Sequence, residues 1–223
     1  MLKLCVLFFL ISGTIWSQDI VTAERYLDMV AQRYGSIRDY EARIAIRSGT
    51  TDMTGTLLNL SPSFLRIDFT RPSGQVIVFN GDQLTIYLPE YRAVLIQAVT
   101  ESSQNTSAGI ASAQGLTMLK RNYTPAYVSS PDPQPLETGS RELVVQLHLT
   151  RRTTSEGFRE LTLSIEPETK LIRRIEGRTI TNAIVRFDFT SIKINQGTPE
   201  QRFIYDPPTS ANLYNNFIFR DSD

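Results

Sequence analysis

Cysteine and histidine are almost absent from this sequence of 223 residues, which holds one of each, Cys5 and His148. A single cysteine excludes a disulfide within the chain, and the pair offers too few ligands for a thiolate zinc site. Without a disulfide framework or a structural metal, the fold must be stabilised by a buried hydrophobic core. A chain of about 200 residues is long enough for one domain to bury such a core.

Charge of either sign is not in excess, because 23 basic and 23 acidic residues give a formal net charge of zero. The sequence shows no block of basic residues and no run in which arginine alternates with aromatic residues. Proteins that bind nucleic acid through its phosphates carry such basic patches. We therefore expect no nucleic-acid partner.

Long hydrophobic runs are also missing, since no stretch approaches the ~18 uninterrupted apolar residues of a membrane-spanning helix. The apolar run at residues 4–11 is short, follows Lys3 and precedes small and polar residues. This order is typical of a secretory signal peptide. We expect residues 1–17 to be removed on export, Cys5 among them, and residues 18–223 to form a single soluble domain.

Catalytic motifs are not found either: the sequence has no H-E-x-x-H, no phosphate-binding glycine loop and no dinucleotide fingerprint. His148 lies in phase with Val144 and Gln146 in an alternating segment, where a solitary histidine is more often structural than catalytic. The glycines around Ser112 stand too far from it for a G-x-S-x-G motif. The scattered carboxylates leave paired-carboxylate hydrolysis open without supporting it. We expect no enzyme activity, no catalytic residue, no metal site and no cofactor.

One amphipathic helix is predicted directly after the signal segment. Thr22 is a suitable N-cap, Glu24 favours the first turn, and Gly35 is a suitable stop. The apolar residues at helical spacing are Tyr26, Leu27, Val30 and Tyr34. This stripe indicates a helix that packs one face against the rest of the protein.

From Tyr40 onward the apolar residues alternate, which predicts a long series of antiparallel strands. The predicted strands are residues 40–47, 55–60, 64–69, 76–79, 84–88, 92–99, 143–149, 161–165, 171–175, 184–194 and 201–205. A polar loop at 100–115 and a short helical piece at 116–121 interrupt the series. The pattern indicates a mainly β fold with few helices (α+β), as a curved sheet or barrel with helices on its concave face; a sandwich stays possible.

Several strands carry more apolar residues than a sheet with one wet face needs. Residues 76–79 are apolar without interruption, and Leu65, Ile67 and Phe69 share one face of their strand. A curved apolar face with few helices to cover it leaves room for an apolar ligand. The alternative is an ordinary close-packed core, and periodicity alone does not choose between the two.

Two stretches of the chain, taken in order, resemble a known family. Their matching positions are residues 55–58, 62–67, 71–72, 77–81, 84 and 87–89 in the first stretch, and 187, 192, 195 and 203–208 in the second. The second stretch ends in a Pro-Pro pair, and the N-terminal helix running into residues 36–40 also fits. Together they resemble the LolA-type lipoprotein carriers over most of the chain after the signal.

The resemblance implies an incomplete antiparallel β-barrel of about eleven strands whose hydrophobic cavity is covered by helices. Members of the family accept triacylated lipoproteins from an inner-membrane ABC transporter, cross the periplasm and pass them to an outer-membrane acceptor. For this chain it therefore implies a monomeric periplasmic carrier whose partners are lipoprotein acyl chains, the inner-membrane ABC lipoprotein-releasing complex and an outer-membrane acceptor. No cofactor is needed.

By position, the resemblance and the apolar surplus select a set of cavity residues and a lid. The expected lipid-binding residues are Leu65, Ile67, Phe69, Val78, Leu84, Ile86, Leu116 and Leu119. Met118 also falls in the region of the central lid helices. The expected lid or gating residues are Ser61 and Ile110.

One departure from the family concerns the lid. Well-studied members carry an arginine before the proline that matches Pro62, and it bonds to lid carbonyls, whereas this chain has Ser61. A lid locked by that arginine is therefore not expected here. A second interpretation in another class is a periplasmic regulatory domain of the same fold that senses lipid or lipoprotein without carrying it.

Overall fold

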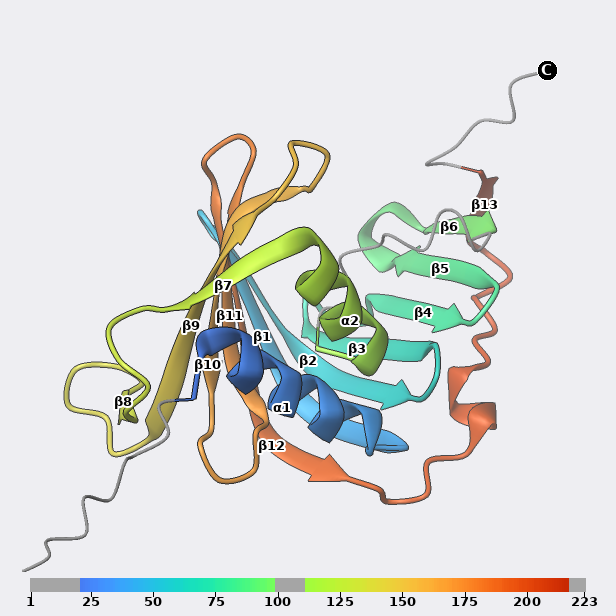
Figure 1. Cartoon of the computed structure of the whole chain (residues 1–223). Coiled ribbons are helices and arrows are strands. Elements are labelled where there is room, and N and C mark those ends of the chain that lie inside the picture. The colour runs from blue at the N-terminus through green and yellow to red at the C-terminus, as the bar shows by residue number, and fades with distance from the viewer. Residues whose placement is uncertain (1–20, 99–110, 217–223) are drawn as a thin grey trace, which may run out of the picture.

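One large curved sheet dominates the computed structural model, which describes residues 21–98 and 111–216 (Figure 1). Thirteen strands join in the order β13-β6-β5-β4-β3-β2-β1-β12-β11-β10-β9-β7, with β8 paired to β9. Their bounds are β1 Asp39–Ser48, β2 Thr51–Leu60, β3 Phe64–Arg71, β4 Val76–Asn80, β5 Gln83–Leu88, β6 Ala93–Ala98, β7 Tyr123–Tyr127, β8 Gln134–Pro135, β9 Leu143–Arg151, β10 Phe158–Ile165, β11 Ile172–Thr179, β12 Ile184–Ile194 and β13 Asn212–Asn215.

The sheet is open, because its outer strands β7 and β13 are not paired with each other within the described ranges. Neighbouring strands are antiparallel except β13, which runs parallel to β6. The predicted class, a mainly β fold with an incomplete barrel and few helices, is confirmed. The strand count exceeds the predicted eleven because some short strands lack alternation: β8 has two residues and β13 has four exposed ones.

Two α-helices lie on the concave side of the sheet in the described residues, α1 Ala23–Gly35 and α2 Ala113–Asn122 (Figure 1). The predicted N-cap of α1 is confirmed, since the Thr22 hydroxyl accepts a hydrogen bond of 3.2 Å from the Arg25 N–H. The helix α2 begins before the predicted residue 116, because the Ser112 hydroxyl caps it by accepting from the Gly115 N–H at 3.0 Å. Most of the predicted loop at 100–115 lies outside the described residues. None of the helices within residues 21–98 and 111–216 is long and apolar enough to cross a membrane.

The strand register defines two faces of the sheet, since residues paired across neighbouring strands lie on the same face. Leu57 pairs with Ile67, and Ile67 pairs with Ile77; this row lies on the concave face, which the helices cover. Leu58, Arg66 and Val78 pair in the adjacent row, on the convex face.

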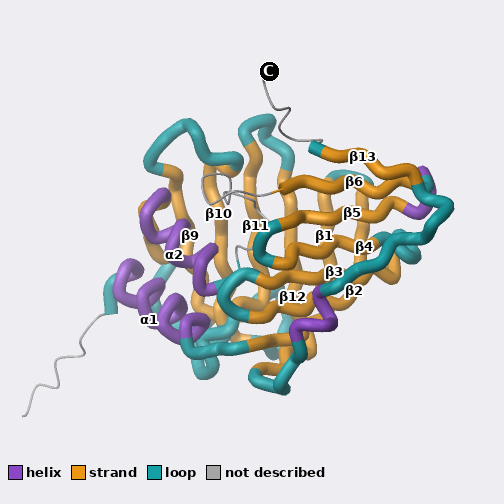
Figure 2. Tube along the Cα trace, turned by 90° about the vertical axis from the view of Figure 1, so that its right-hand side faces the viewer, coloured by secondary structure: helices purple, strands orange, loops and turns teal. Residues whose placement is uncertain are grey.

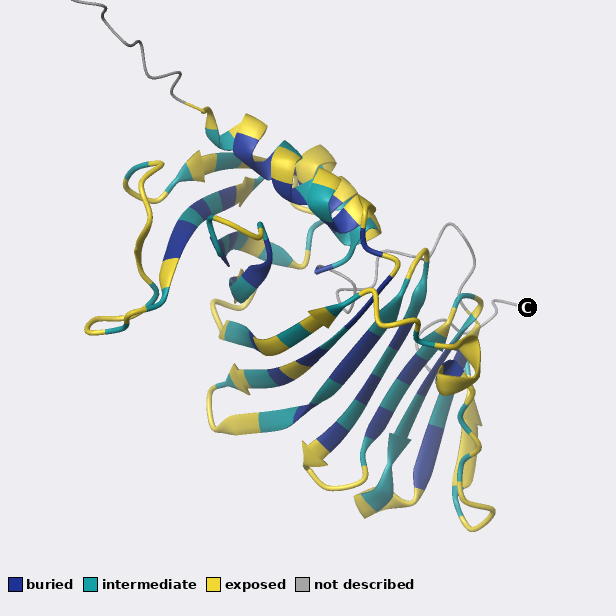
Figure 3. Cartoon of the chain, turned by 90° about the horizontal axis from the view of Figure 1, so that it is seen from below, coloured by how far each residue is buried: buried dark blue, intermediate teal, exposed yellow. Residues whose placement is uncertain are grey.

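The main hydrophobic core lies between the concave face and the two helices, whose inner sides are buried (Figure 3). Leu27 and Val30 of α1 and Leu116 of α2 are at most 1% exposed there. Each such side chain contributes about 1.5–3 kcal/mol through removal of its surface from water. The amphipathic stripe of α1 is therefore a packing face, as its spacing predicts.

A second, smaller core lies on the convex face beneath residues 196–211, which we call the C-terminal strap (Figure 2). The strap begins after β12 and ends before β13, and it contains the short 3-10 helix Glu200–Phe203. The strand predicted at 201–205 is therefore wrong. Phe203 of this helix is 1% exposed and packs with Leu58, Val76 and Val78. The buried ring of Phe203 therefore attaches the strap to the convex face of the sheet, although this part of the strap forms no strand.

Candidate apolar binding site

An apolar cavity of about 200 Å³ opens on the concave face of the sheet. Carbon atoms dominate its wall, since Tyr40 carries the one polar side chain among the lining residues. These residues are Tyr40, Ile44, Ile46, Leu57, Ile67, Ile77, Ala111, Ile175, Phe187 and Phe189. A space of this kind favours the hydrocarbon part of a ligand and offers little to a charged group.

Cross-strand pairing brings these residues together from six strands. On β1, Ile44 pairs with Phe189 and Ile46 with Phe187 of β12. Ile175 of β11 pairs with Phe187, which extends the apolar row by one more strand. The alternation of side chains then places every second residue of these strands on the cavity side.

The three residues predicted on β3 lie together on the concave face, each 5–6% exposed. Ile67 lines the cavity, and Leu65 and Phe69 belong to the same core without lining it. Leu116 and Leu119 of α2 are also buried in this core. The structure thus brings five of the predicted residues to one side of the sheet.

Leu84 and Ile86 continue the concave face onto β5. Leu84 pairs with Phe79, and Ile86 pairs with Ile77, which itself lines the cavity. Neither Leu84 nor Ile86 belongs to the lining. They lie at the side of the cavity towards the sheet edge.

Val78 is misplaced by the sequence prediction. It pairs with Arg66 on the convex face and packs with Phe203 of the strap, with the sheet between it and the cavity. The continuous apolar run at 76–79 hides which residues face which side, because the strap buries the convex side of β4 and both faces of this strand therefore carry apolar residues. Ile77, the neighbour of Val78, is the residue of this strand that lines the cavity.

Ser61 is exposed, and its backbone N–H donates to the Arg38 carbonyl at 2.7 Å. It lines a small hollow of about 10 Å³ together with Tyr40, Ser112 and Ala113, beside the first turn of α2. The position predicted to gate the lid therefore lies next to the start of a helix that covers the core. Ile110, the other predicted lid residue, lies outside the described residues.

Two buried tyrosines, Tyr40 in the cavity wall and its ring neighbour Tyr34, stay uncharged. Burial raises the pKa of Tyr40 well above its ordinary value of 10.0, and the neighbouring Tyr34 raises it further. Burial also raises the pKa of Tyr34 to about 12, although the Ile172 N–H, which donates to its hydroxyl at 3.1 Å, acts in the opposite direction. Both rings therefore present neutral, largely apolar surfaces at ordinary pH.

Several lining residues escape sequence analysis, above all Ile44, Ile46, Phe187 and Phe189. The alternation within residues 40–46 is a visible signal for the first two. The pairing of β1 with β12, far along the chain, is not visible in the sequence, so the four residues give no sign of sharing one cavity.

The chemistry of the remaining groups does not converge on the cavity. His148 pairs with Thr162 on the convex face, and its Nε2 lies 3.6 Å from a Glu160 oxygen at the surface. Within residues 21–98 and 111–216, no group of three or more His, Cys, Asp or Glu residues is placed to hold a metal ion. The arrangement is suited to holding an apolar group.

Comparisons with known proteins give a family and a fold. The family model described as outer membrane lipoprotein carrier protein LolA matches residues 47–206. The outer-membrane lipoprotein carrier protein of Dechloromonas aromatica (strain RCB) is 22% identical over 160 residues, which cover 72% of this chain and 70% of that protein.

Two solved structures share the fold. An uncharacterised conserved protein from Thermus thermophilus has a TM-score of 0.55 and 15% identity, over 86% of this chain and 98% of its own. A chain of the Pseudomonas aeruginosa MucA/MucB complex has a TM-score of 0.52 and 13% identity, over 86% of this chain and 63% of its own. At these identities the likeness concerns the fold alone.

Proposed function

Because the chain belongs to the LolA family of outer membrane lipoprotein carrier proteins, we propose that it binds the acyl chains of lipoproteins in the concave cavity. We further propose that it carries them across the periplasm, from the inner to the outer membrane. The role is binding and release, with no covalent chemistry and no cofactor. The observation that carries the proposal is the apolar cavity of about 200 Å³ on the concave face.

The energetics of an acyl chain call for such a cavity. Exposing a chain of about 15 methylenes to water costs on the order of 12 kcal/mol, at ~0.8 kcal/mol each. A carrier must offset most of this cost and still release the chain. The cavity is smaller than the roughly 300–1,000 Å³ of common ligand pockets. Binding a whole chain therefore requires the helices over the concave face to move outward.

The residues proposed to contact the acyl chain lie on both sides of that opening. Ile67 lines the cavity itself, while Leu116 and Leu119 belong to the helix that would move. Leu65, Phe69, Leu84 and Ile86 extend the same face of the sheet, and movement of the helices would expose them to the ligand. Ser61 and Ile110 remain the proposed gating positions at the start of the lid.

The cellular setting follows from the same proposal. Residues 1–17 act as a signal peptide, and the mature monomer works in the periplasm between an inner-membrane ABC lipoprotein-releasing complex and an outer-membrane acceptor. Mature protein from an export-competent host should begin near Gln18 and appear in the soluble periplasmic fraction. An intact N-terminus in the membrane fraction would contradict export by a cleaved signal.

Native mass spectrometry tests binding directly. The purified mature protein is mixed with a synthetic triacylated lipopeptide, and the control is the same peptide without acyl chains. We expect a one-to-one complex with the acylated peptide alone. Equal binding of both peptides, or of neither, would contradict the proposal.

A transfer assay separates a carrier from the sensing alternative. The loaded protein is incubated with acceptor vesicles, and the lipopeptide that remains bound is measured over time. A carrier loses its cargo to the vesicles. A sensor retains it, and retention would favour the regulatory interpretation.

A further inference from the structure

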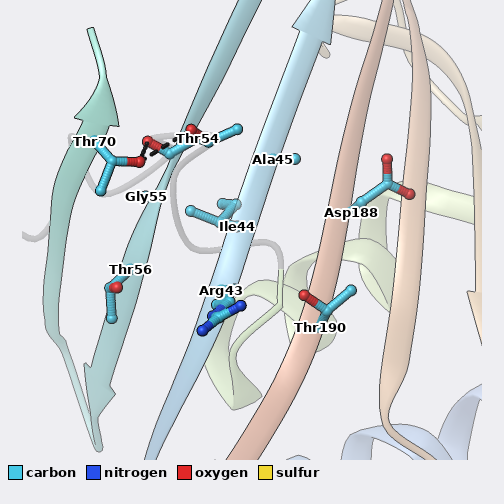
Figure 4. Close-up of a pocket in the computed structure, with 9 residues that line it drawn as sticks. All are labelled: Arg43, Ile44, Ala45, Thr54, Gly55, Thr56, Thr70, Asp188 and Thr190. Carbon is cyan, nitrogen blue, oxygen red and sulfur yellow. Dashed lines mark hydrogen bonds between the residues drawn. The ribbon is translucent and has the colours of Figure 1, made fainter. Parts of the chain in front are cut away.

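A second hollow, of about 480 Å³, lies on the convex face, on the opposite side of the sheet from the apolar cavity (Figure 4). It spans β3, β2, β1 and β12, and six of its nine lining residues carry polar side chains. The lining residues are Arg43, Ile44, Ala45, Thr54, Gly55, Thr56, Thr70, Asp188 and Thr190. The hollow forms because small side chains occupy this part of the face, between the strap and the charged side chains of β11 and β12.

The side chain of Arg43 has no hydrogen bond or ion pair in the part of the chain that the structure describes, which sets it apart from neighbouring arginines of the same face. Arg66 lies 2.8 Å from Asp68, and Arg174 lies 2.5 Å from Asp188. Arg47 also reaches Asp188, at 3.5 Å. The carboxylate nearest to the hollow is thus already engaged by two other arginines, and the guanidinium of Arg43 keeps its donors for a ligand.

Two threonines stand on either side of Arg43. Thr56 pairs with it across β2, and Thr190 pairs with it across β12. Paired side chains of an antiparallel ladder are about 5 Å apart, so the three polar groups border one small space. Within the described ranges neither hydroxyl has a hydrogen-bond partner, whereas Thr54 and Thr70 bond to each other at 3.0 Å.

We propose that this hollow binds a phosphate group, held by the Arg43 guanidinium and by the hydroxyls of Thr56 and Thr190. The planar fork of arginine matches two phosphate oxygens, and charge-assisted bonds of this kind are the strong ones. The remaining oxygens are free to accept from the two threonines, which flank the guanidinium. Asp188 and Asp68 repel an anion little, because arginines neutralise both carboxylates.

The phosphate belongs either to a soluble phosphate ester or to a phospholipid headgroup, and both present the same group to Arg43. A molecule in this hollow is separate from an acyl chain in the concave cavity, since the sheet lies between them. The inference therefore goes beyond the proposed carrier function. Its test does not depend on whether the protein binds acyl chains.

The experiment measures phosphate binding by wild type and matched variants at low salt. One arm titrates glycerol phosphate by calorimetry; the other follows co-sedimentation with phosphatidylcholine vesicles that contain phosphatidylglycerol. The variants are Arg43→Gln, Thr56→Val and Thr190→Val, where valine keeps the branched shape of a strand residue. The control is Arg38→Gln, which removes the same charge from an exposed arginine just before β1.

We expect Arg43→Gln to weaken binding about tenfold or more, and each threonine variant to weaken it about two- to fivefold. Arg38→Gln should stay within about twofold of wild type. If binding of glycerol phosphate depends on Arg43, the ligand is a soluble phosphate ester. If only vesicle binding depends on Arg43, the ligand is a phospholipid headgroup. Either result supports the proposal.

Two results would overturn it: no saturable binding of either probe by wild type, or an equal loss in Arg38→Gln and Arg43→Gln. Thermal melting and fatty-acid binding are measured on the same variants. Unchanged fatty-acid binding by Arg43→Gln shows that the sheet is intact. If the protein bound no fatty acid, the carrier proposal would fail, but the comparison of phosphate binding by Arg43→Gln and wild type would still test the phosphate site.

Discussion

The Tyr40 hydroxyl donates a hydrogen bond of 2.7 Å to the carbonyl of Ala111, the residue just before the N-cap of α2. Both residues line the apolar cavity, and Tyr40 is 5% exposed. One buried bond therefore ties the sheet to the start of a covering helix. Because burial raises the pKa of Tyr40 well above its ordinary value, the hydroxyl keeps its proton and remains a donor.

Tyr40→Phe should loosen the start of α2. The change removes one buried hydrogen bond and leaves the Ala111 carbonyl without its partner, which costs about 1–3 kcal/mol. Amide hydrogen exchange in the first turn of α2 should accelerate, while exchange in β1 should change little.

Tyr127→Phe is the matched control for that measurement. Its hydroxyl donates to the Val21 carbonyl at 2.8 Å, next to the start of α1 and away from the N-terminus of α2. Loss of this bond should affect exchange in the first turn of α1. If Tyr40→Phe leaves α2 unchanged, the Tyr40–Ala111 bond does not hold the helix.

Ser61→Arg tests the other proposed gating position. Ser61 lines the same small hollow as Tyr40 and Ser112, so an arginine there lies close to the Ala111 region. In the Tyr40→Phe background the free Ala111 carbonyl should accept from the new guanidinium. Exchange in the first turn of α2 should then slow towards the wild-type rate. Exchange as fast as in Tyr40→Phe alone would show that Ser61 is out of reach.

Asp39 anchors the beginning of the strap and makes stability depend on pH. Its carboxylate accepts from the N–H groups of Gln196 and Gly197 at 2.9 and 3.1 Å and from the Thr198 hydroxyl at 3.0 Å. Burial acts to raise the pKa of Asp39, but these hydrogen bonds outweigh it and lower the pKa below its ordinary value. The carboxylate thus stabilises the fold above its unfolded pKa of about 3.9, and this stability is lost as the pH falls through the folded pKa.

Asp39→Asn should therefore lower the free energy of unfolding at pH 7 by about 1–3 kcal/mol, with a smaller difference from wild type near pH 3. Urea unfolding at both pH values measures this. Asp52→Asn, at an exposed surface pair, is the control and should change stability by less than about 1 kcal/mol. An equal effect of Asp39→Asn at both pH values would be evidence against this linkage.

Helical spacing of apolar residues predicts the helix α1, and alternation predicts most of the strands and the side of β3 that faces the cavity. It does so because one wet and one buried face impose a period of two on each strand. The same argument fails at Val78, where the strap covers the convex face and removes the polar positions that would mark it. The argument fails at Phe203 for a related reason. A buried phenylalanine in a short 3-10 helix gives the same apolar signal in the sequence as a buried residue of a strand.

A local sequence pattern also cannot predict which residues line the cavity together. Ile44 and Phe189 meet only because β1 pairs with β12, and that pairing closes a long loop in the chain. Arg66 gives a second example. Arg66 lies on the polar side of β3, so its sequence position suggests that a substitution there would leave the fold and the cavity unchanged. However, its guanidinium donates to the Arg202 and Ile204 carbonyls of the strap at 2.8 and 3.3 Å. A charge reversal at Arg66 would disturb the strap, so a control for β3 must lie elsewhere.

Binding of a fluorescent fatty acid by Ile67→Glu, with thermal melting of the same samples, tests the central claim that the concave cavity holds the acyl chain. Thr70→Glu places the same charge on β3 at an exposed position of the convex side, and Ile77→Glu repeats the test at a half-buried lining residue. A carboxylate in the cavity must either stay charged beside the acyl chain at a cost of several kcal/mol or take up a proton with a raised pKa. We predict that Ile67→Glu and Ile77→Glu stay folded and bind about 100-fold more weakly, while Thr70→Glu binds like wild type. Folded cavity variants that bind as well as wild type, or unfolding of both, would contradict the account.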